Sequence, residues 1–236
     1  VVLLVFSVPY LVGLIISRPT MAFSGFMFAL EDIHSYIAKM RYGASGAWGL
    51  TLVYTTEPQQ QAPLVFAYLM LLGRLAGLLG GAGARSETLF FVLTYHAARL
   101  LCGGLYLTVL YRFVAEYLDG AGQRRLAWGL IAVCGGLGYV LMGTSEAFLD
   151  MPVDFYLPEA FSFLQVFALP HLALARALML GGWLLLFGAL RGRQARMVLA
   201  ASACWAGMTA IVPFFGALLG VLIAAWLLAQ ALHACC

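Results

Sequence analysis

The sequence predicts an all-α polytopic membrane protein, because of its composition, its long apolar runs and the placement of its charges. Of its 236 residues, 64% are hydrophobic and 10% are charged, and the mean hydropathy is +0.96. Soluble domains carry about 25% charged residues, so this composition excludes them. The formal net charge of +3 is too small to indicate a nucleic-acid partner. We expect a single transmembrane domain over residues 1–236, in contact with membrane lipid.

Seven apolar runs come close to the ~20 residues that a helix needs to cross a bilayer. The first run, 1–17, carries no charge and is expected to be the first span. The other runs are 62–80, 88–118, 126–144, 171–190, 197–212 and 214–233. We expect the remaining spans within residues 88–233.

Arginines indicate the orientation of the chain. The loops that contain Arg124-Arg125 and residues 191–196 are basic, whereas the loop 145–160 contains acids and no base. Lysine and arginine are enriched on the cytoplasmic side of membrane proteins. We therefore expect the two basic loops inside and the loop 145–160 outside.

This orientation limits the number of crossings before Arg124. If the first span runs outward, only one of the runs 62–80 and 88–118 can cross. The run 62–80 has Arg74 in its middle, so we expect it to lie in the outer interface with that arginine reaching polar surroundings. The predicted architecture is about six spans plus external juxtamembrane helices.

Residues 18–86 form the long external loop, in which we expect amphipathic and interfacial helices. The segment from Asp32 to Arg41 has apolar residues at helical spacing, which predicts a short amphipathic helix. The acidic pair Glu31-Asp32 opens it. Acids are favourable in the first turn of any helix, and acids at a membrane face also mark functional sites. The pair alone fits both interpretations.

The order of these parts resembles the GT-C superfamily of polytopic glycosyltransferases, which use polyprenyl-phosphate-linked sugars. The resemblance covers nearly the whole chain. Its residues are the acidic pair with Tyr36-Ile37-Ala38-Lys39-Met40-Arg41, then Tyr54-Thr55-Thr56-Glu57-Pro58, the interfacial run from Ala62-Pro63-Leu64 to Leu72-Gly73, a span with His96 and Arg99, and Leu157-Pro158-Glu159-Ala160-Phe161-Ser162-Phe163 leading to Pro170-His171.

The resemblance implies glycosyl transfer from a polyprenyl-phosphate sugar at the outer face of a bacterial inner (plasma) membrane. It assigns the catalytic carboxylate, as a base or as a group that orients the metal and the donor, to Asp32 or Glu31. Lys39, Arg41 and Arg74 lie on the same external side and are the candidates for binding the donor phosphate. The resemblance requires no particular cofactor and allows a divalent cation, Mg²⁺ or Mn²⁺, with Asp32 and Glu57 as its candidate ligands.

Four further residues are secondary candidates, each with a structural alternative. Glu57 precedes a proline and is either a site residue or an exposed turn residue. Glu159 is a carboxylate in an apolar external segment and is either a cavity residue or a surface residue. His171 begins a span and either caps the helix or binds a phosphate at its N-terminus. Arg99 lies inside a span and either serves the site or pairs with an acid or a backbone carbonyl.

Other interpretations remain open. Gln59 stands where GT-C relatives often have a histidine, and the chain is shorter than many members, so we expect it to be a partial or shortened chain. The main alternative is a non-catalytic GT-C-like subunit of a larger membrane complex. A pigment- or haem-binding subunit with His96 as axial ligand is a further alternative. The terminal pair Cys235-Cys236 fits either lipidation or the end of a fragment.

Overall fold

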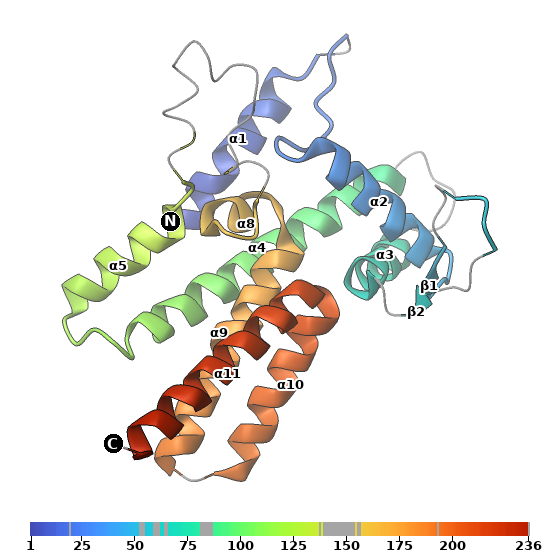
Figure 1. The fold of residues 1–236 in the computed structure, drawn as a ribbon. Coiled ribbons are helices and arrows are strands. Elements are labelled where there is room, and N and C mark those ends of the chain that lie inside the picture. Colours follow the sequence, from blue (N-terminus) through green and yellow to red (C-terminus); the bar gives the residue numbers. More distant parts are fainter. Residues whose placement is uncertain are drawn as a thin grey trace.

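The computed structural model describes residues 1–18, 20–51, 55–58, 62–63, 66–80, 87–136, 138, 154, 157–192 and 194–235. These residues form nine helices and one two-stranded sheet (Figure 1). The helices are α1 (Val2–Ile16), α2 (Leu30–Ala44), α3 (Ala67–Gly80), α4 (Glu87–Val114), α5 (Ala121–Val133), α8 (Ser162–Ala168), α9 (Pro170–Gly192), α10 (Ala195–Ile211) and α11 (Pro213–Cys235). Strands β1 (Gly49–Leu50) and β2 (Ala62–Pro63) pair antiparallel. The predictions made for Tyr54, Gln59 and Arg193 lie outside the described residues.

Three helices are long and apolar enough to cross a membrane. They are Thr88–Val114 in α4, Pro170–Gly192 in α9 and Pro213–His233 in α11, with mean hydropathies of 1.3, 1.8 and 2.1. At 1.5 Å per residue, the 28 residues of α4 extend about 42 Å, more than the ~30 Å of a hydrocarbon core. The described chain is thus mainly helical, as the composition predicted, and it carries three candidate spans where about six were expected.

Three further apolar helices are shorter than a bilayer is thick. Helices α1, α3 and α10 have 15, 14 and 17 residues, or about 21–26 Å. Helix α5 ends at Val133, although the apolar run was predicted to continue to 144. The reason is local: Cys134 is extended and Gly136 has φ +77°, a conformation that ends a helix. Residues 139–153 lie outside the described part.

The helices define two ends of the molecule. Helices α9, α10 and α11 pack side by side, and α4 packs against α9 (Figure 1). An ion pair between Arg191 and Glu116 joins the last turn of α9 to the segment that follows α4. We call this the basic end, because Arg124 and Arg125 follow Glu116 closely in the chain. The first turn of α9 and the α10–α11 junction lie at the opposite end.

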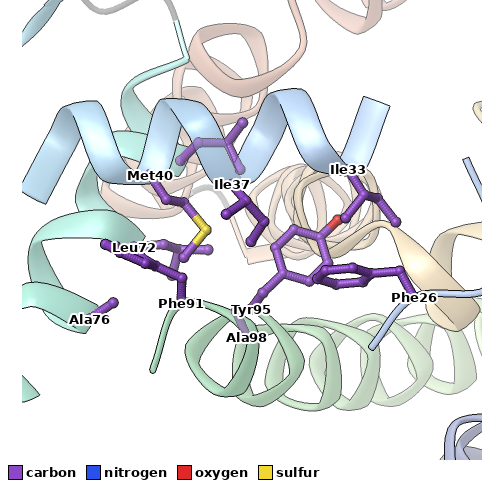
Figure 2. Close-up of a cluster of buried hydrophobic side chains, with 10 residues drawn as sticks. Phe26, Ile33, Ile37, Met40, Leu72, Ala76, Phe91, Tyr95 and Ala98 are labelled. Carbon is purple, nitrogen blue, oxygen red and sulfur yellow. The ribbon is translucent and has the colours of Figure 1, made fainter. Parts of the chain in front are cut away.

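Helix α2 covers the first half of α4 with its apolar face (Figure 2). Ile33 and Met40 are fully buried, and they pack with Phe91 and Tyr95 of α4 in one hydrophobic cluster. These positions follow the helical spacing that predicted the amphipathic helix. The packing fixes the rotation of α2 and therefore the direction of its polar side chains.

Helices α2 and α3 approach each other closely at glycines. A Cβ atom on Gly73 would lie 1.8 Å from the carbonyl oxygen of Met40, and one on Gly43 would lie 2.3 Å from that of Met70. Small residues permit such backbone contact between helices. The contact holds α3, which is too short to span a bilayer at this length, against the amphipathic helix, and its other apolar side chains pack on α4.

Candidate functional site

Two polar side chains of α2 point toward the start of α9. The ring of Tyr36 meets that of His171 edge to face, with 5.0 Å between centroids. Nζ of Lys39 lies 4.2 Å from the ring centroid of Phe66 and 5.5 Å from that of Tyr36, and it donates a hydrogen bond to Ser35 Oγ at 2.6 Å. The middle of α2 thus brings a phenol and an ammonium to the N-terminus of a candidate span.

Glu159 reaches the same place from the segment before α8. Nε2 of Gln165 donates to the carbonyls of Pro158 and Glu159 at 3.0 and 2.8 Å, and Arg176 also donates to the carbonyl of Glu159. Gln165 is fully buried. The backbone of Glu159 is therefore held by side chains from α8 and α9, which keeps this residue beside the start of α9.

These elements enclose a cavity of about 150 Å³ at the end opposite the basic end. Its polar lining comes from Glu159, His171 and Tyr68, and its apolar lining comes from Phe66 and the turn Val212-Pro213. At about 30 Å³ per water, the space holds about five water molecules. It therefore suits a group the size of a phosphate rather than a whole sugar with its lipid. Nδ1 of His171 is buried and has no hydrogen-bond partner among the described residues.

The charges around the cavity act on one another. Burial, reinforced by the carboxylates of Asp32 and Glu159, raises the pKa of Tyr36 to about 12. Burial lowers the pKa of Lys39, and the carboxylate of Asp32 opposes this change. The Tyr36 phenol thus stays protonated at neutral pH and can donate a hydrogen bond. Asp32 helps Lys39 to remain an ammonium.

The two carboxylates predicted as catalytic lie beside this cavity rather than in its lining. Asp32 and Glu31 occupy the first turn of α2 and are exposed. Asp32 shares a helix face with Tyr36 and Lys39, because residues four and seven apart align on a helix. It lies about 6 Å, one helical turn, before Tyr36 along the axis, and the cavity lining contains no residue of α2. Glu57 is exposed in the short described segment 55–58.

Of the three cations proposed for the phosphate, only Lys39 lies at the cavity. Arg41 is exposed and donates to Thr88 Oγ1 at 2.7 Å. Arg74 was expected to reach polar surroundings at the interface. Instead, it donates to the carbonyl of Gly46 at 2.6 Å, and its guanidinium lies 3.8 Å from the ring centroid of Trp48. It satisfies backbone carbonyls just beyond the end of α2, which is a structural role.

Arg99 also has a structural role. Its guanidinium donates to Ser7 Oγ at 2.9 Å, to the carbonyl of Phe167 at 3.3 Å and to Nδ1 of His96 at 3.3 Å. The carbonyl of Phe167 lies at the C-terminal end of α8, where the helix dipole favours a positive charge. Tyr10 donates to the same carbonyl at 2.8 Å. Of the sequence-based alternatives for Arg99, pairing with a backbone carbonyl is the one that the structure contains.

The arrangement leaves no ring nitrogen of His96 available for a metal. Nε2 lies 2.8 Å from the carbonyl oxygen of Gly25, and Nδ1 accepts from Arg99. Within the described residues, no group of three or more His, Cys, Asp or Glu side chains could hold a metal ion. The proposed pairing of Asp32 with Glu57 around a divalent cation therefore finds no third ligand of these types in this part of the chain.

Some residues of the site were missed by sequence reasoning. Tyr36 was given no role in the site, although it lies one turn after Asp32. Arg176 was not considered, although an arginine inside an apolar run is itself a signal of function or structural pairing. Gln165 belongs to α8, a short helix that was not predicted.

The chain was compared with models of protein families, with curated proteins and with solved structures, and none of the three comparisons gave a match.

Proposed function

We propose that the protein transfers a glycosyl group from a polyprenyl-phosphate sugar at the outer face of the membrane, as a GT-C-type enzyme. The observation that carries the proposal is the cavity lined by Glu159 and His171, with Lys39 beside it, at one end of three candidate spans. A carboxylate, an imidazole and an ammonium at such a boundary suit a substrate whose phosphate is polar and whose chain is apolar.

The proposed reaction needs a base for the acceptor and a cation for the leaving group. The acceptor oxygen attacks the anomeric carbon of the sugar, and the bond between that carbon and the phosphate oxygen breaks. The electron pair of the broken bond stays on the polyprenyl phosphate, which leaves. The proton of the acceptor hydroxyl goes to a carboxylate. The products are the glycosylated acceptor, the polyprenyl phosphate and a protonated carboxyl group.

The side chains around the cavity suggest the roles. Glu159 is the carboxylate in the lining and is our first candidate for the base; Asp32 is the second. Lys39 is the candidate for neutralising the phosphate, with His171 and Tyr36 as further hydrogen-bonding groups. A resident divalent cation is not needed for any of these assignments.

The proposal includes the finer architecture. We propose six spans, formed by α1, α4, α9, α10, α11 and the segment that begins with α5, with α3 in the outer interface. The length of α3 and its contacts with the amphipathic α2 support this position. In this arrangement the basic end is cytoplasmic and the cavity is external.

A non-catalytic subunit of a larger complex is the second candidate. The observation that favours it is that Arg41, Arg74 and Arg99 all make structural contacts. A phosphate site with one cation is weaker than the three-cation site that the resemblance implied. This candidate predicts that no carboxylate substitution at the cavity changes a transfer rate, because there is no transfer.

The test measures sugar transfer from a polyprenyl-phosphate sugar by the protein in liposomes. We expect Glu159→Gln to lower the rate by about 10²–10⁴-fold, the usual cost of losing a general base. Glu57→Gln, at an exposed carboxylate outside the cavity lining, is the control and should leave the rate unchanged if Glu159 is the base.

The outcomes separate the candidates. A large loss in Asp32→Asn with a normal rate in Glu159→Gln would move the base to Asp32. Binding of the lipid phosphate without transfer in the wild-type protein, over a panel of donor sugars, would support the non-catalytic subunit and contradict the enzyme.

A further inference from the structure

A second hollow lies near the basic end, between α4 and α5. Its volume is about 430 Å³, and it opens to the surface. Six residues line it: Leu107, Thr108, Tyr111 and Arg112 from α4, and Arg125 and Trp128 from α5. This groove is separate from the cavity at Glu159 and shares no residue with it.

The groove has rigid aromatic and apolar walls. Nε1 of Trp128 donates to the carbonyl of Leu107 at 2.8 Å, which fixes the indole across the two helices. The rings of Tyr111 and Trp128 meet edge to face, with 6.5 Å between centroids. Tryptophan and tyrosine are enriched at the membrane–water interface, where one end of the side chain is apolar and the other is wet. The walls therefore match the level of lipid headgroups.

Two arginines give the groove its charge. Arg112 lies in the last turn of α4 and Arg125 near the start of α5, and both are exposed. In the described part of the chain, neither makes an ion pair or a hydrogen bond with another residue. The nearby basic residues differ, since Arg124 donates to the carbonyl of Leu118 and Arg191 pairs with Glu116. Two exposed guanidinium groups without a protein partner among the described residues thus line one groove. The guanidinium group of arginine is well suited to phosphate oxygens.

We propose that this groove binds an anionic phospholipid of the leaflet at the basic end. The phosphate lies between Arg112 and Arg125, and an acyl chain lies along Leu107 and Trp128. Helix α5 also exposes Leu126 and Leu130, which extends the apolar surface available to the chain. A free phosphate would use the two arginines alone and leave the apolar walls uncovered, so the combination favours a lipid. The proposal does not depend on the reaction proposed for the other end.

The experiment measures lipid binding to the detergent-solubilised protein by native mass spectrometry. The protein is titrated with dioleoyl phosphatidylglycerol and with dioleoyl phosphatidylcholine, which have the same chains and differ in net charge. Inorganic phosphate is titrated separately as a competitor. We expect tighter binding of phosphatidylglycerol and no competition by millimolar phosphate.

The variant R112Q/R125Q should bind phosphatidylglycerol about tenfold to thirtyfold more weakly, the effect of two basic residues near a lipid surface. R191Q/R196Q removes two exposed arginines at the same end and is the matched control, with wild-type binding expected. Equal binding of the two lipids by the wild-type protein would overturn the proposal, whether or not the double variant folds. Full displacement by inorganic phosphate, or equal loss in the control, would also overturn it.

Discussion

Lys39 is a partly buried cation whose charge depends on a neighbouring acid. Its pKa is lowered by burial, and Asp32 opposes this. A phosphate binds the ammonium form, so affinity is full below the pKa of Lys39 and is lost as the pH rises through it. Asp32→Asn removes the opposing charge and lowers this pKa further. We therefore expect the affinity for farnesyl phosphate to fall at a lower pH in Asp32→Asn than in the wild type.

A titration of binding between about pH 7 and pH 10.5 would measure this shift, because an unperturbed lysine titrates near the upper limit. Glu31→Gln is the control. It removes a charge from the same turn, but about 100° around the helix from Asp32. An equal shift in both variants, or none in Asp32→Asn, would show that Lys39 does not bind the phosphate.

Arg99 should affect stability rather than binding. In Arg99→Met, Nδ1 of His96 loses its donor, Ser7 Oγ loses one, and the carbonyl of Phe167 keeps only the bond from Tyr10. Leaving buried polar groups without partners costs about 1–3 kcal/mol. We expect a lower thermal unfolding midpoint in micelles, and unchanged lipid-phosphate affinity for the folded fraction. Arg41→Met, which removes one exposed hydrogen bond, should change the midpoint little. Normal stability with lost binding would assign Arg99 to the site.

At this scale the sequence predicted residue types better than their directions. Lys39, Glu159 and His171 were each predicted as candidates, and the structure brings them to one place. Asp32 was predicted as the catalytic carboxylate, but it lies outside the cavity lining. The position of Asp32 relative to the cavity depends on how α2 packs on Phe91 and Tyr95. These residues are distant in the sequence, so local spacing could not reveal that position.

The contact between α2 and α3 leaves no room for a side chain at Gly43 or Gly73. Gly73→Ala would put a Cβ atom 1.8 Å from a backbone carbonyl of α2, and a backbone carbonyl cannot move aside as a side chain can. Overpacking of this kind costs about 1–3 kcal/mol or more. We expect a lower thermal unfolding midpoint and faster proteolysis near residues 45–50.

Gly220→Ala is the matched control for that variant. Gly220 lies inside α11, and a Cβ atom there would meet nothing within 4 Å. Because alanine favours a helix over glycine by about 1 kcal/mol, this change should leave the midpoint equal or higher. If both variants behave alike, the close approach of α2 and α3 does not exist in the protein.

Helix boundaries were predictable where periodicity or proline marks them. The runs 171–190 and 197–212 match α9 and α10 to within two residues at each end. Helix α8 was missed, because its seven residues are too few to establish a period. It ends at Ala168 because Pro170 has no N–H group and starts a new helix instead.

For the whole molecule, the two ends should face opposite sides of the membrane. Single cysteines replacing Glu31, Leu157 or Arg196 can be placed in a variant that lacks the five natural cysteines. All three positions are exposed. We expect an impermeant maleimide to label the first two in intact cells, and the third only after permeabilisation. Labelling of all three from one side would contradict the proposed orientation.

The overall architecture was predictable only in part. Composition indicated membrane helices. The loops with Arg124-Arg125 and residues 191–196 were predicted on one side, and the ion pair of Arg191 with Glu116 agrees with a common end. The number of spans is not tested by the three long helices. The convergence of α3, α9 and the segment before α8 on one cavity was not predictable, because it depends on the break at Leu169 and on contacts between residues more than 100 positions apart, such as Tyr36 with His171.

The carbonyl end of α8 has a consequence for how the chain is made. Ribosomes deliver the helices in order, so α4 enters the membrane with Arg99 before Phe167, 68 residues later, has been synthesised. Until then, Arg99 lacks this carbonyl and has only earlier partners such as Ser7 and His96, and a guanidinium near the middle of a nascent span costs up to about 2.5–3.5 kcal/mol at insertion. Helix α4 therefore inserts into the bilayer before the carbonyl that later stabilises Arg99 has been translated. Nascent chains that end between residues 115 and 160 should leave the membrane or remain in the translocon. Chains extended past residue 170 should stay inserted in the membrane.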